Sequence, residues 1–203
     1  MRLYDRLPDR VTVGRRTYRI NLDFRNVLRL FDTLAEKNLM PEARQYLALR
    51  CVMRRPPKRR TGETFAAVME IIAGDRHVSG EQKKVMSFEQ DADLILAAFR
   101  QAYGIDLYHD RLHWLAFRAL LVGLPEGTRY AEVVSIRSRE IPMATKYNGA
   151  EISWLMKAKA AVALKLTDEE REASMRRTGH ETAMSLLAYA QAFAPKGGDD
   201  NGG

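Results

Sequence analysis

The sequence has almost no cysteine, because Cys51 is the single thiol among its 203 residues. One cysteine cannot form a disulfide within the chain, and no second thiol is present to share a metal site with it. Cys51 stands between Arg50 and Val52 in a helical pattern. We therefore expect Cys51 to be a small residue of the core.

Long hydrophobic runs are also missing. The uninterrupted apolar stretches are short, such as Leu94–Phe99 and Ala119–Val122, whereas a helix that crosses a bilayer needs about 20 apolar residues. Charged residues interrupt the first eight positions, so the sequence predicts no secretory signal peptide. We expect the protein to remain in the cytoplasm in which it is made.

What is present is an ordinary globular composition, with 46% hydrophobic and 29% charged residues. A disordered, collagen-like or low-complexity chain is excluded. The length fits a single domain. We predict one domain over residues 1–194 and a disordered tail over residues 195–203, because the tail is rich in glycine and has nothing to bury.

The formal net charge of +7 is distributed unevenly. Residues 1–60 carry a net +10, residues 61–110 a net −5 and residues 111–203 a net +2. The densest basic stretch is the segment 54–60, in which two prolines prevent a helix and favour an extended linker. Its charged members are Arg54, Arg55, Lys58, Arg59 and Arg60. Composition leaves open whether they meet phosphate, an acidic protein surface or water.

The hydrophobic spacing predicts a mainly α-helical bundle of seven or eight helices with a short N-terminal β-hairpin. Alternating residues around Gly14 indicate the hairpin over about residues 10–21. Asn21 or Asp23 is placed to cap the first helix, and Pro41 suits the first turn of the second. The predicted helices cover residues 24–34, 41–52, 65–74, 87–104, 111–123, 130–138, 150–164 and 167 onward.

The helix predicted over residues 111–123 is apolar on nearly all sides, which is typical of the centre of a bundle. We therefore predict a core that this helix shares with the one before it. The predicted core residues are Phe99, Tyr103, His113, Trp114 and Phe117.

The strongest catalytic candidate is the pair His109 and His113, which stand four residues apart with Asp110 after the first. This is one substitution from the H-E-x-x-H motif of zinc proteases. However, aspartate is one methylene shorter than glutamate, and His109 precedes the predicted helix. We instead expect Asp110 to cap that helix and His113 to be packed and hydrogen-bonded, with no metal and no cofactor.

Other catalytic patterns are equally weak. Asp91 and Asp93 point in different directions on a helix, so they do not converge, and we expect Asp91 to accept a hydrogen bond from the central helix. The glycines match neither phosphate-binding loop, and there is no G-x-S-x-G elbow. The sequence therefore predicts a protein that is not an enzyme.

Several stretches resemble a family of small tailed-phage and prophage proteins, named after the fifteenth gene product of a Listeria siphophage. The resemblance covers about residues 10–140 and depends on these motifs: Asp23-Phe24-Arg25, Phe88-Glu89-Gln90-Asp91, Tyr103-Gly104-Ile105-Asp106-Leu107 and Leu112-His113-Trp114-Leu115-Ala116-Phe117. The resemblance implies a tail assembly chaperone in the cytoplasm of the bacterial host, with tape-measure and tail-tube proteins as partners and no catalytic residues. Neither the basic linker nor the C-terminal helix is inherited from it.

Two segments are candidates for binding a partner. One is the basic segment 54–60; the other is the last predicted helix, whose apolar stripe includes Leu186, Leu187 and Phe193. The alternative for that stripe is packing on its own bundle. Two other functions stay open beside the chaperone: a head–tail connector or tail-completion component of the virion, and a nucleic-acid-binding phage protein that uses the segment 54–60.

Overall fold

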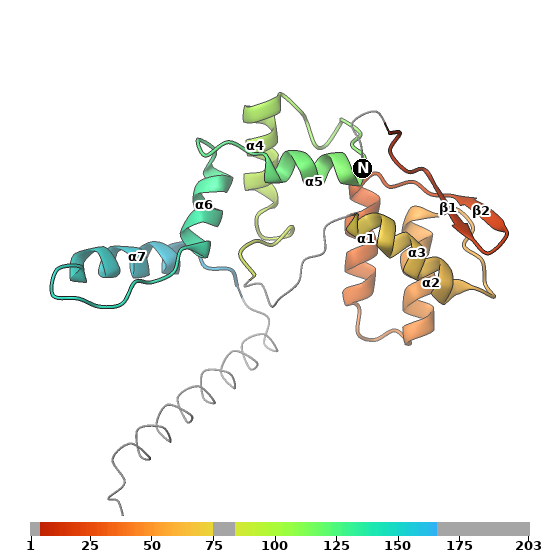
Figure 1. The fold of residues 1–203 in the computed structure, drawn as a ribbon, viewed down its shortest axis with the longest axis horizontal. Coiled ribbons are helices and arrows are strands. Elements are labelled where there is room, and N and C mark those ends of the chain that lie inside the picture. The colour runs from red at the N-terminus through yellow and green to blue at the C-terminus, as the bar shows by residue number, and fades with distance from the viewer. Residues whose placement is uncertain (1–4, 75–83, 166–203) are drawn as a thin grey trace, which may run out of the picture. The chain divides into compact units, whose positions relative to one another are not determined.

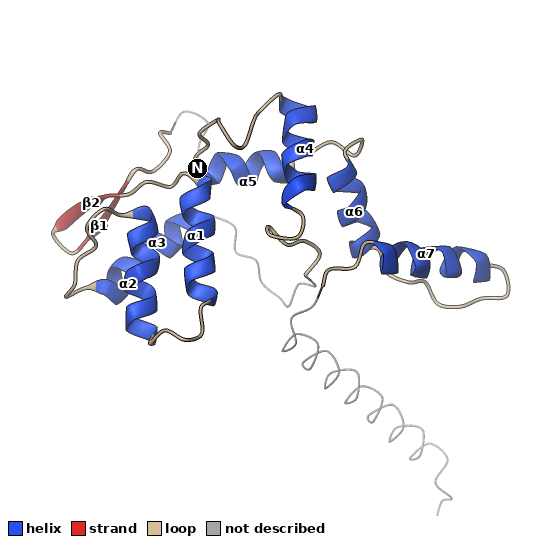
Figure 2. Cartoon of the chain, turned by 180° about the vertical axis from the view of Figure 1, so that it is seen from behind, coloured by secondary structure: helices blue, strands red, loops and turns tan. Residues whose placement is uncertain are grey.

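The computed structural model describes residues 5–74 and 84–165 (Figure 1). Its elements confirm a mainly α-helical fold with a two-stranded N-terminal hairpin (Figure 2). In chain order they are β1 (Arg10–Val13), β2 (Arg16–Arg19), α1 (Phe24–Ala35), α2 (Pro41–Val52), α3 (Thr61–Ala73), α4 (Ala92–Tyr103), α5 (Trp114–Val122), α6 (Arg129–Ser138) and α7 (Gly149–Ala161).

All of these elements lie in one compact unit that ends at Val162. The predicted C-terminal helix and the predicted boundary at residues 194 and 195 lie outside the described residues.

The hairpin forms where the alternating pattern predicts it. β1 and β2 are antiparallel, and Val11 pairs with Tyr18 while Val13 pairs with Arg16. The turn between them needs Gly14, whose φ of +58° lies in the left-handed region that other residues rarely adopt. Val11 and Val13 are buried, and β1 packs against α3. The hairpin therefore has one face turned to the core and one turned to solvent.

An extended segment after the hairpin connects both halves of the chain. The backbone N–H of Asn21 donates to the carbonyl of Val52 over 2.8 Å. The N–H of Phe24 donates to Leu112 O over 2.9 Å, and the N–H of Trp114 donates to Leu22 O over 2.7 Å. These bonds pair the residues before α1 with those before α5, so both helices start from one short antiparallel bridge.

The helix starts follow local capping chemistry. Asp23 caps α1, as predicted, because its carboxylate accepts a hydrogen bond from the N–H of Arg25. Pro41 is the first residue of α2, also as predicted. α3 begins at Thr61, four residues before the apolar stripe, and the hydroxyl of Thr64 donates to Arg60 O.

Three predicted helix starts are wrong, including that of α3, which begins at Thr61 rather than at residue 65. α5 begins at Trp114 rather than at Arg111, because the ring of His113, not Asp110, accepts the capping hydrogen bond, from the N–H of Leu115. α4 begins at Ala92, and the Ser87 hydroxyl instead accepts from the N–H of Gln90 in a turn before the helix. α7 begins at Gly149, one residue before its predicted start, and Oδ1 of Asn148 accepts from the N–H of Thr145 in the preceding loop.

An aromatic cluster fills the core around α5. The ring of Phe117 stacks on Phe24 at a centroid distance of 4.6 Å and on Phe99 at 5.2 Å. Trp114 lies 5.9 Å from Phe117, and its indole N–H donates to Ile72 O over 2.9 Å. Tyr103 packs edge-on against Phe99. Burial of several aromatic rings in contact is a large contribution to stability.

Candidate functional site

The basic hairpin and the basic linker meet in an open groove of about 480 Å³, here called the arginine groove. It is lined by Val13, Gly14, Arg15, Arg16, Tyr18, Pro57, Arg59 and Arg60. No acidic side chain in the described ranges 5–74 and 84–165 lines it. Arg15, Arg16 and Arg59 are exposed. Four guanidinium groups therefore surround one concave surface.

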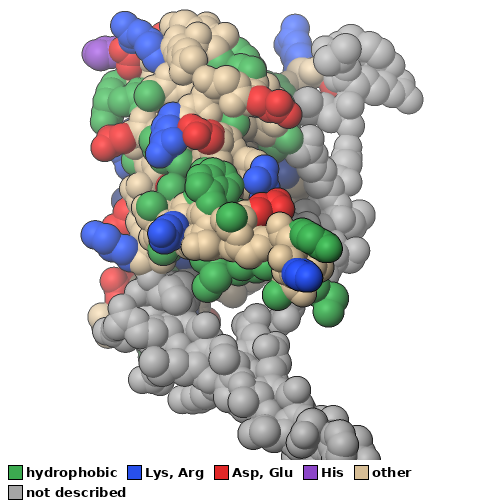
Figure 3. All heavy atoms as spheres, turned by 90° about the vertical axis from the view of Figure 1, so that its left-hand side faces the viewer, with side chains coloured by type: hydrophobic (Ala, Val, Ile, Leu, Met, Phe, Trp, Pro, Cys, Tyr) green, Lys and Arg blue, Asp and Glu red, His purple; other side chains and the backbone are tan. Residues whose placement is uncertain are grey.

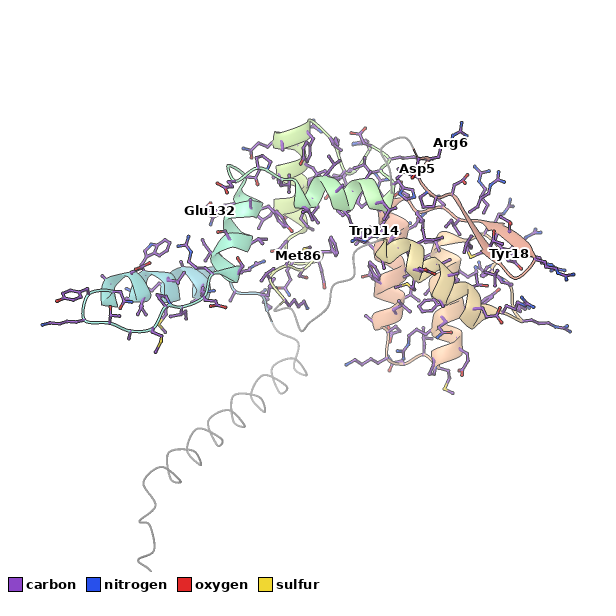
Figure 4. All side chains as sticks on the ribbon, viewed as in Figure 1. Asp5, Arg6, Tyr18, Met86, Trp114 and Glu132 are labelled. Carbon is purple, nitrogen blue, oxygen red and sulfur yellow. The ribbon has the colours of Figure 1, made fainter. Side chains whose placement is uncertain are left out.

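The hairpin register explains how two of these side chains reach the groove. Residues paired across an antiparallel ladder point to the same face of the sheet. Because Val13 pairs with Arg16 and Val11 with Tyr18, the side chains of Arg16 and Tyr18 lie on the same face as the two buried valines. On that face α3 packs against β1, whereas the side chains of Arg16 and Tyr18 on β2 line the groove. Tyr18, labelled on the hairpin in Figure 4, is half-buried.

The linker supplies the opposite wall. It is not helical, as the two prolines predict, and Pro56 is buried while the charged residues around it are exposed. One guanidinium lies directly against the hairpin turn. A methyl group built on Gly14 would overlap Nη1 of Arg60. Glycine at position 14 thus provides both the turn and the space for this guanidinium.

The groove also adjoins the start of a helix. Arg60 is the N-cap of α3, and its side chain makes no capping hydrogen bond. The positive end of the α3 dipole therefore adds to the arginine charges. One carboxylate opposes them: Oε2 of Glu63 lies 3.6 Å from Nη1 of Arg60, and both side chains are more than half exposed. Such an exposed pair is weak and is easily exchanged for another anion.

The structure divides the predicted basic segment rather than keeping it together. Arg59 and Arg60 line the arginine groove, whereas Arg54 lines a different pocket of about 500 Å³ that includes Arg19, Arg111 and His113. Arg55 and Lys58 are exposed and line neither of them. Two residues that sequence analysis did not single out, Arg15 and Arg16, take their place. A strand register drawn around Gly14 in the predicted hairpin would have placed Arg16 opposite Val13.

The two histidines of the candidate metal motif do not converge. His109 is largely exposed and lies 3.1 Å from Asp106 Oδ2. His113 uses Nδ1 to cap α5, while its Nε2 lies 3.1 Å from Pro8 O. Within the described residues, no group of three or more His, Cys, Asp or Glu side chains is arranged to hold a metal ion.

Asp91 is a buried carboxylate with a different partner from the one predicted. Its hydrogen bonds come from Arg137 on α6 and not from the central helix, over 2.7 and 2.9 Å. The N–H of Ser87 also donates to it. The pKa of Tyr130 is raised to about 12, mainly by burial of Tyr130 and then by the nearby negative charge of Asp91. This cluster joins the start of α4 to α6.

Hydrophobic side chains are exposed on and before α7, here called the apolar segment (residues 141–156). Leu155 is the one buried residue of α7. Figure 3 views the side on which α7 lies in Figure 1, and hydrophobic side chains are visible there among charged ones. The exposed set and its exposed fractions are Ile141 (49%), Met143 (89%), Tyr147 (91%), Trp154 (55%) and Met156 (55%).

The second predicted binding segment, with Leu186, Leu187 and Phe193, lies outside the described residues. Among the helices that are described, none is long and apolar enough to span a bilayer.

The described residues define a mainly α-helical protein with an N-terminal hairpin, a basic groove and an exposed apolar segment. A family model described as Bacteriophage Gp15 protein matches residues 3–164, so the chain belongs to this family. The match includes every described element and confirms the phage family predicted from the sequence motifs. No curated protein and no solved structure matches the chain.

Proposed function

We propose that this phage protein is a non-enzymatic tail assembly chaperone that binds the tape-measure and tail-tube proteins during tail morphogenesis. The observation that carries the proposal is the apolar segment, residues 141–156, with its five exposed hydrophobic side chains. Membership of the Bacteriophage Gp15 family supports a phage role. The tail role itself comes from the sequence resemblance.

The composition of the apolar segment suits a protein-binding surface. Trp, Tyr and Met are enriched where proteins bind each other, and Trp and Tyr often contribute most of the binding energy. Five large hydrophobic side chains are exposed within 16 residues of the chain, and a concentration of exposed apolar surface is typical of an interaction site. Trp154 and Met156 are each about half exposed, so a partner can bury them further.

The chemistry of the segment also fits the partner implied by the resemblance. A tape-measure protein is a long helical chain, and helices present apolar stripes that bind hydrophobic surfaces of other proteins. Methionine adapts its shape to different apolar partners, because its side chain is unbranched and flexible. One segment can therefore bind successive stretches of a long helical partner.

The proposal is tested by co-expression of the full chain with the tape-measure and tail-tube proteins of the same phage, followed by affinity purification. The double variant Trp154→Ser/Met156→Ser is expected to lose tape-measure binding by about 10-fold or more, because each truncated anchor costs more than about 1 kcal/mol. The matched control is Met40→Ser, which removes a side chain of similar exposure (71%) before α2. Equal binding by all three proteins would contradict the proposal.

Mass spectrometry of purified virions separates the chaperone from the structural alternative. A chaperone is expected to be absent from the particle or present in trace amounts. Stoichiometric copies in mature virions would instead identify a head–tail connector or tail-completion component, and the chaperone proposal would be wrong.

A further inference from the structure

The arginine groove is a second candidate surface, separate in residues from the apolar segment. It brings together Arg15 and Arg16 of the hairpin with Arg59 and Arg60 of the linker, although more than 40 positions separate them in the sequence. No residue of α7 lines it. A function assigned to this groove is therefore independent of the tail chaperone proposal.

We propose that the arginine groove binds single-stranded nucleic acid, with the guanidinium groups on successive phosphates and Tyr18 stacked on a base. Guanidinium is planar, always charged and able to hold a phosphate through two parallel hydrogen bonds. Proteins that bind single strands combine a positively charged groove along the backbone with aromatic side chains against the bases. The arginine groove has both parts within about 480 Å³.

The alternative ligand is an acidic peptide, and Tyr18 distinguishes the two. A peptide carboxylate satisfies the arginines but offers no flat ring for an aromatic side chain to stack on, whereas every nucleotide carries a base. Tyr18 lines the groove among the arginines and is half-buried, so its ring is held in place by packing. A fixed ring loses little conformational freedom on stacking. These observations favour the nucleotide chain.

Three of the arginines are available to a ligand. Within the described ranges, Arg15, Arg16 and Arg59 make no ion pair, and Arg60 has only the long, exposed contact with Glu63. Phosphate binding to Arg60 competes with this carboxylate. Glu63 therefore weakens the site, and its removal strengthens binding.

The test uses the full chain and a fluorescein-labelled oligothymidylate of about 12 nucleotides, with binding followed by fluorescence anisotropy. Counterion release predicts a slope of about −0.7 per phosphate neutralised on a single strand. With three or four contacts, the affinity is expected to fall about 20- to 50-fold between about 50 and about 200 mM salt.

The double variant Arg59→Gln/Arg60→Gln is expected to weaken binding by about 10-fold or more at about 50 mM salt and to reduce the salt slope by about 1.4. The matched control is Arg129→Gln/Arg139→Gln, which removes the same charge from two exposed arginines of α6 and its C-cap. The control is expected to change the affinity less than about 2-fold. Equal losses in the two variants would show attraction to net charge alone, and the proposal would be wrong.

A second pair of variants tests the competing carboxylate. Glu63→Gln is expected to raise the affinity about 2- to 3-fold, since it frees Arg60. Glu132→Gln removes the carboxylate of the same kind of exposed pair, Arg129–Glu132, on a helix that does not line the groove. Glu132 is labelled in Figure 4, and its variant is expected to leave the affinity unchanged.

Tyr18→Leu keeps the apolar contact with the core and removes the aromatic ring, so it is expected to weaken oligothymidylate binding about 5-fold or more.

A glutamate peptide of equal total charge is the competitor that tests the alternative. If this peptide binds through Arg59 and Arg60 while the oligonucleotide does not, the groove is a protein-binding site and the proposal is wrong. Absence of oligonucleotide binding at about 50 mM salt also overturns it.

Discussion

Arg137 binds Asp91 through two hydrogen bonds of 2.7 and 2.9 Å, although the two residues stand 46 positions apart. The Asp91 side chain is 2% exposed and that of Arg137 10%. Arg137 also donates to the carbonyls of Val162 and Val85. One buried guanidinium thus joins the start of α4 and the end of α7 to α6.

Loss of one partner in this pair is expected to be costly. Asp91→Asn leaves the Arg137 charge buried without its counter-ion, and we expect the free energy of unfolding to fall by about 3–5 kcal/mol. Urea denaturation followed by circular dichroism measures it. The control is Glu132→Gln in the exposed pair with Arg129, with an expected loss below about 1 kcal/mol. Equal losses in both variants would contradict the role assigned to Asp91.

The aromatic core supplies a second prediction. Phe117 is 1% exposed and stacks on both Phe24 and Phe99, so Phe117→Ala leaves a cavity between these two rings. We expect a loss of about 3–5 kcal/mol in the free energy of unfolding. Tyr108→Ala, at a side chain that is 74% exposed, is the comparison and is expected to stay within about 0.5 kcal/mol. A loss below 1 kcal/mol for Phe117→Ala would show that Phe117 is not central to the core.

Acid stability depends in part on Asp106. Its pKa is lowered from 3.8 to about 2, mainly because the backbone N–H of Tyr108 donates a hydrogen bond to its carboxylate. The side chain of His109 donates a second hydrogen bond, and Arg100 adds a third over 2.6 Å. Because the folded pKa lies below the unfolded one, this stabilisation is complete above about pH 4 and is lost as the pH falls through about 2.

Asp106→Asn is therefore expected to lower the free energy of unfolding at about pH 5 and to have a much smaller effect near pH 2. Urea denaturation of both proteins at the two pH values measures the difference. If the difference between the variant and the wild type is the same at both, Asp106 does not carry this pH dependence.

Two glycines with positive φ allow an effect on stability to be separated from an effect on the arginine groove. Gly14 and Gly104 both have positive φ, +58° and +67°, so alanine at either site costs about 1–2 kcal/mol of backbone strain. At Gly14 the added methyl group also meets the Arg60 guanidinium, whereas among the described residues nothing lies within 4 Å of one at Gly104.

We therefore expect Gly14→Ala and Gly104→Ala to lower the melting temperature by similar amounts, while Gly14→Ala alone weakens oligothymidylate binding. Differential scanning fluorimetry and fluorescence anisotropy give the two readouts. Equal binding by both variants would show that the position of Arg60 over the turn is unimportant for the ligand.

Local chemistry made several elements predictable. Asp23 before an apolar stripe, Pro41 at a helix start and Gly14 between alternating residues each act within a few positions of the chain, and each is found where it was expected. The start of α5 was missed because His113 is an uncommon cap. Its ring is held in place by tertiary contact, since Nε2 lies 3.1 Å from Pro8 O, more than 100 positions away.

The sites were less predictable, because they join distant parts of the chain. The count of charges located the basicity in residues 1–60, but not which arginines share a surface. Likewise, α7 was predicted as a helix, but its exposed Trp154 and Met156 were not anticipated. A count of apolar positions around that helix would have shown that Leu155, Trp154 and Met156 cannot all face one side.

The sequence by itself determined the mainly α-helical class, the hairpin, the non-helical basic linker and the phage family. The reason is that hydrophobic spacing, helix caps, prolines and motifs are properties of neighbouring residues. Only the tertiary structure decided that Arg16 and Tyr18 lie opposite Arg59 and Arg60, that Asp91 is held by Arg137 and that the apolar segment stays uncovered. Those relationships depend on strand register and helix packing, which bring together residues that no local pattern connects.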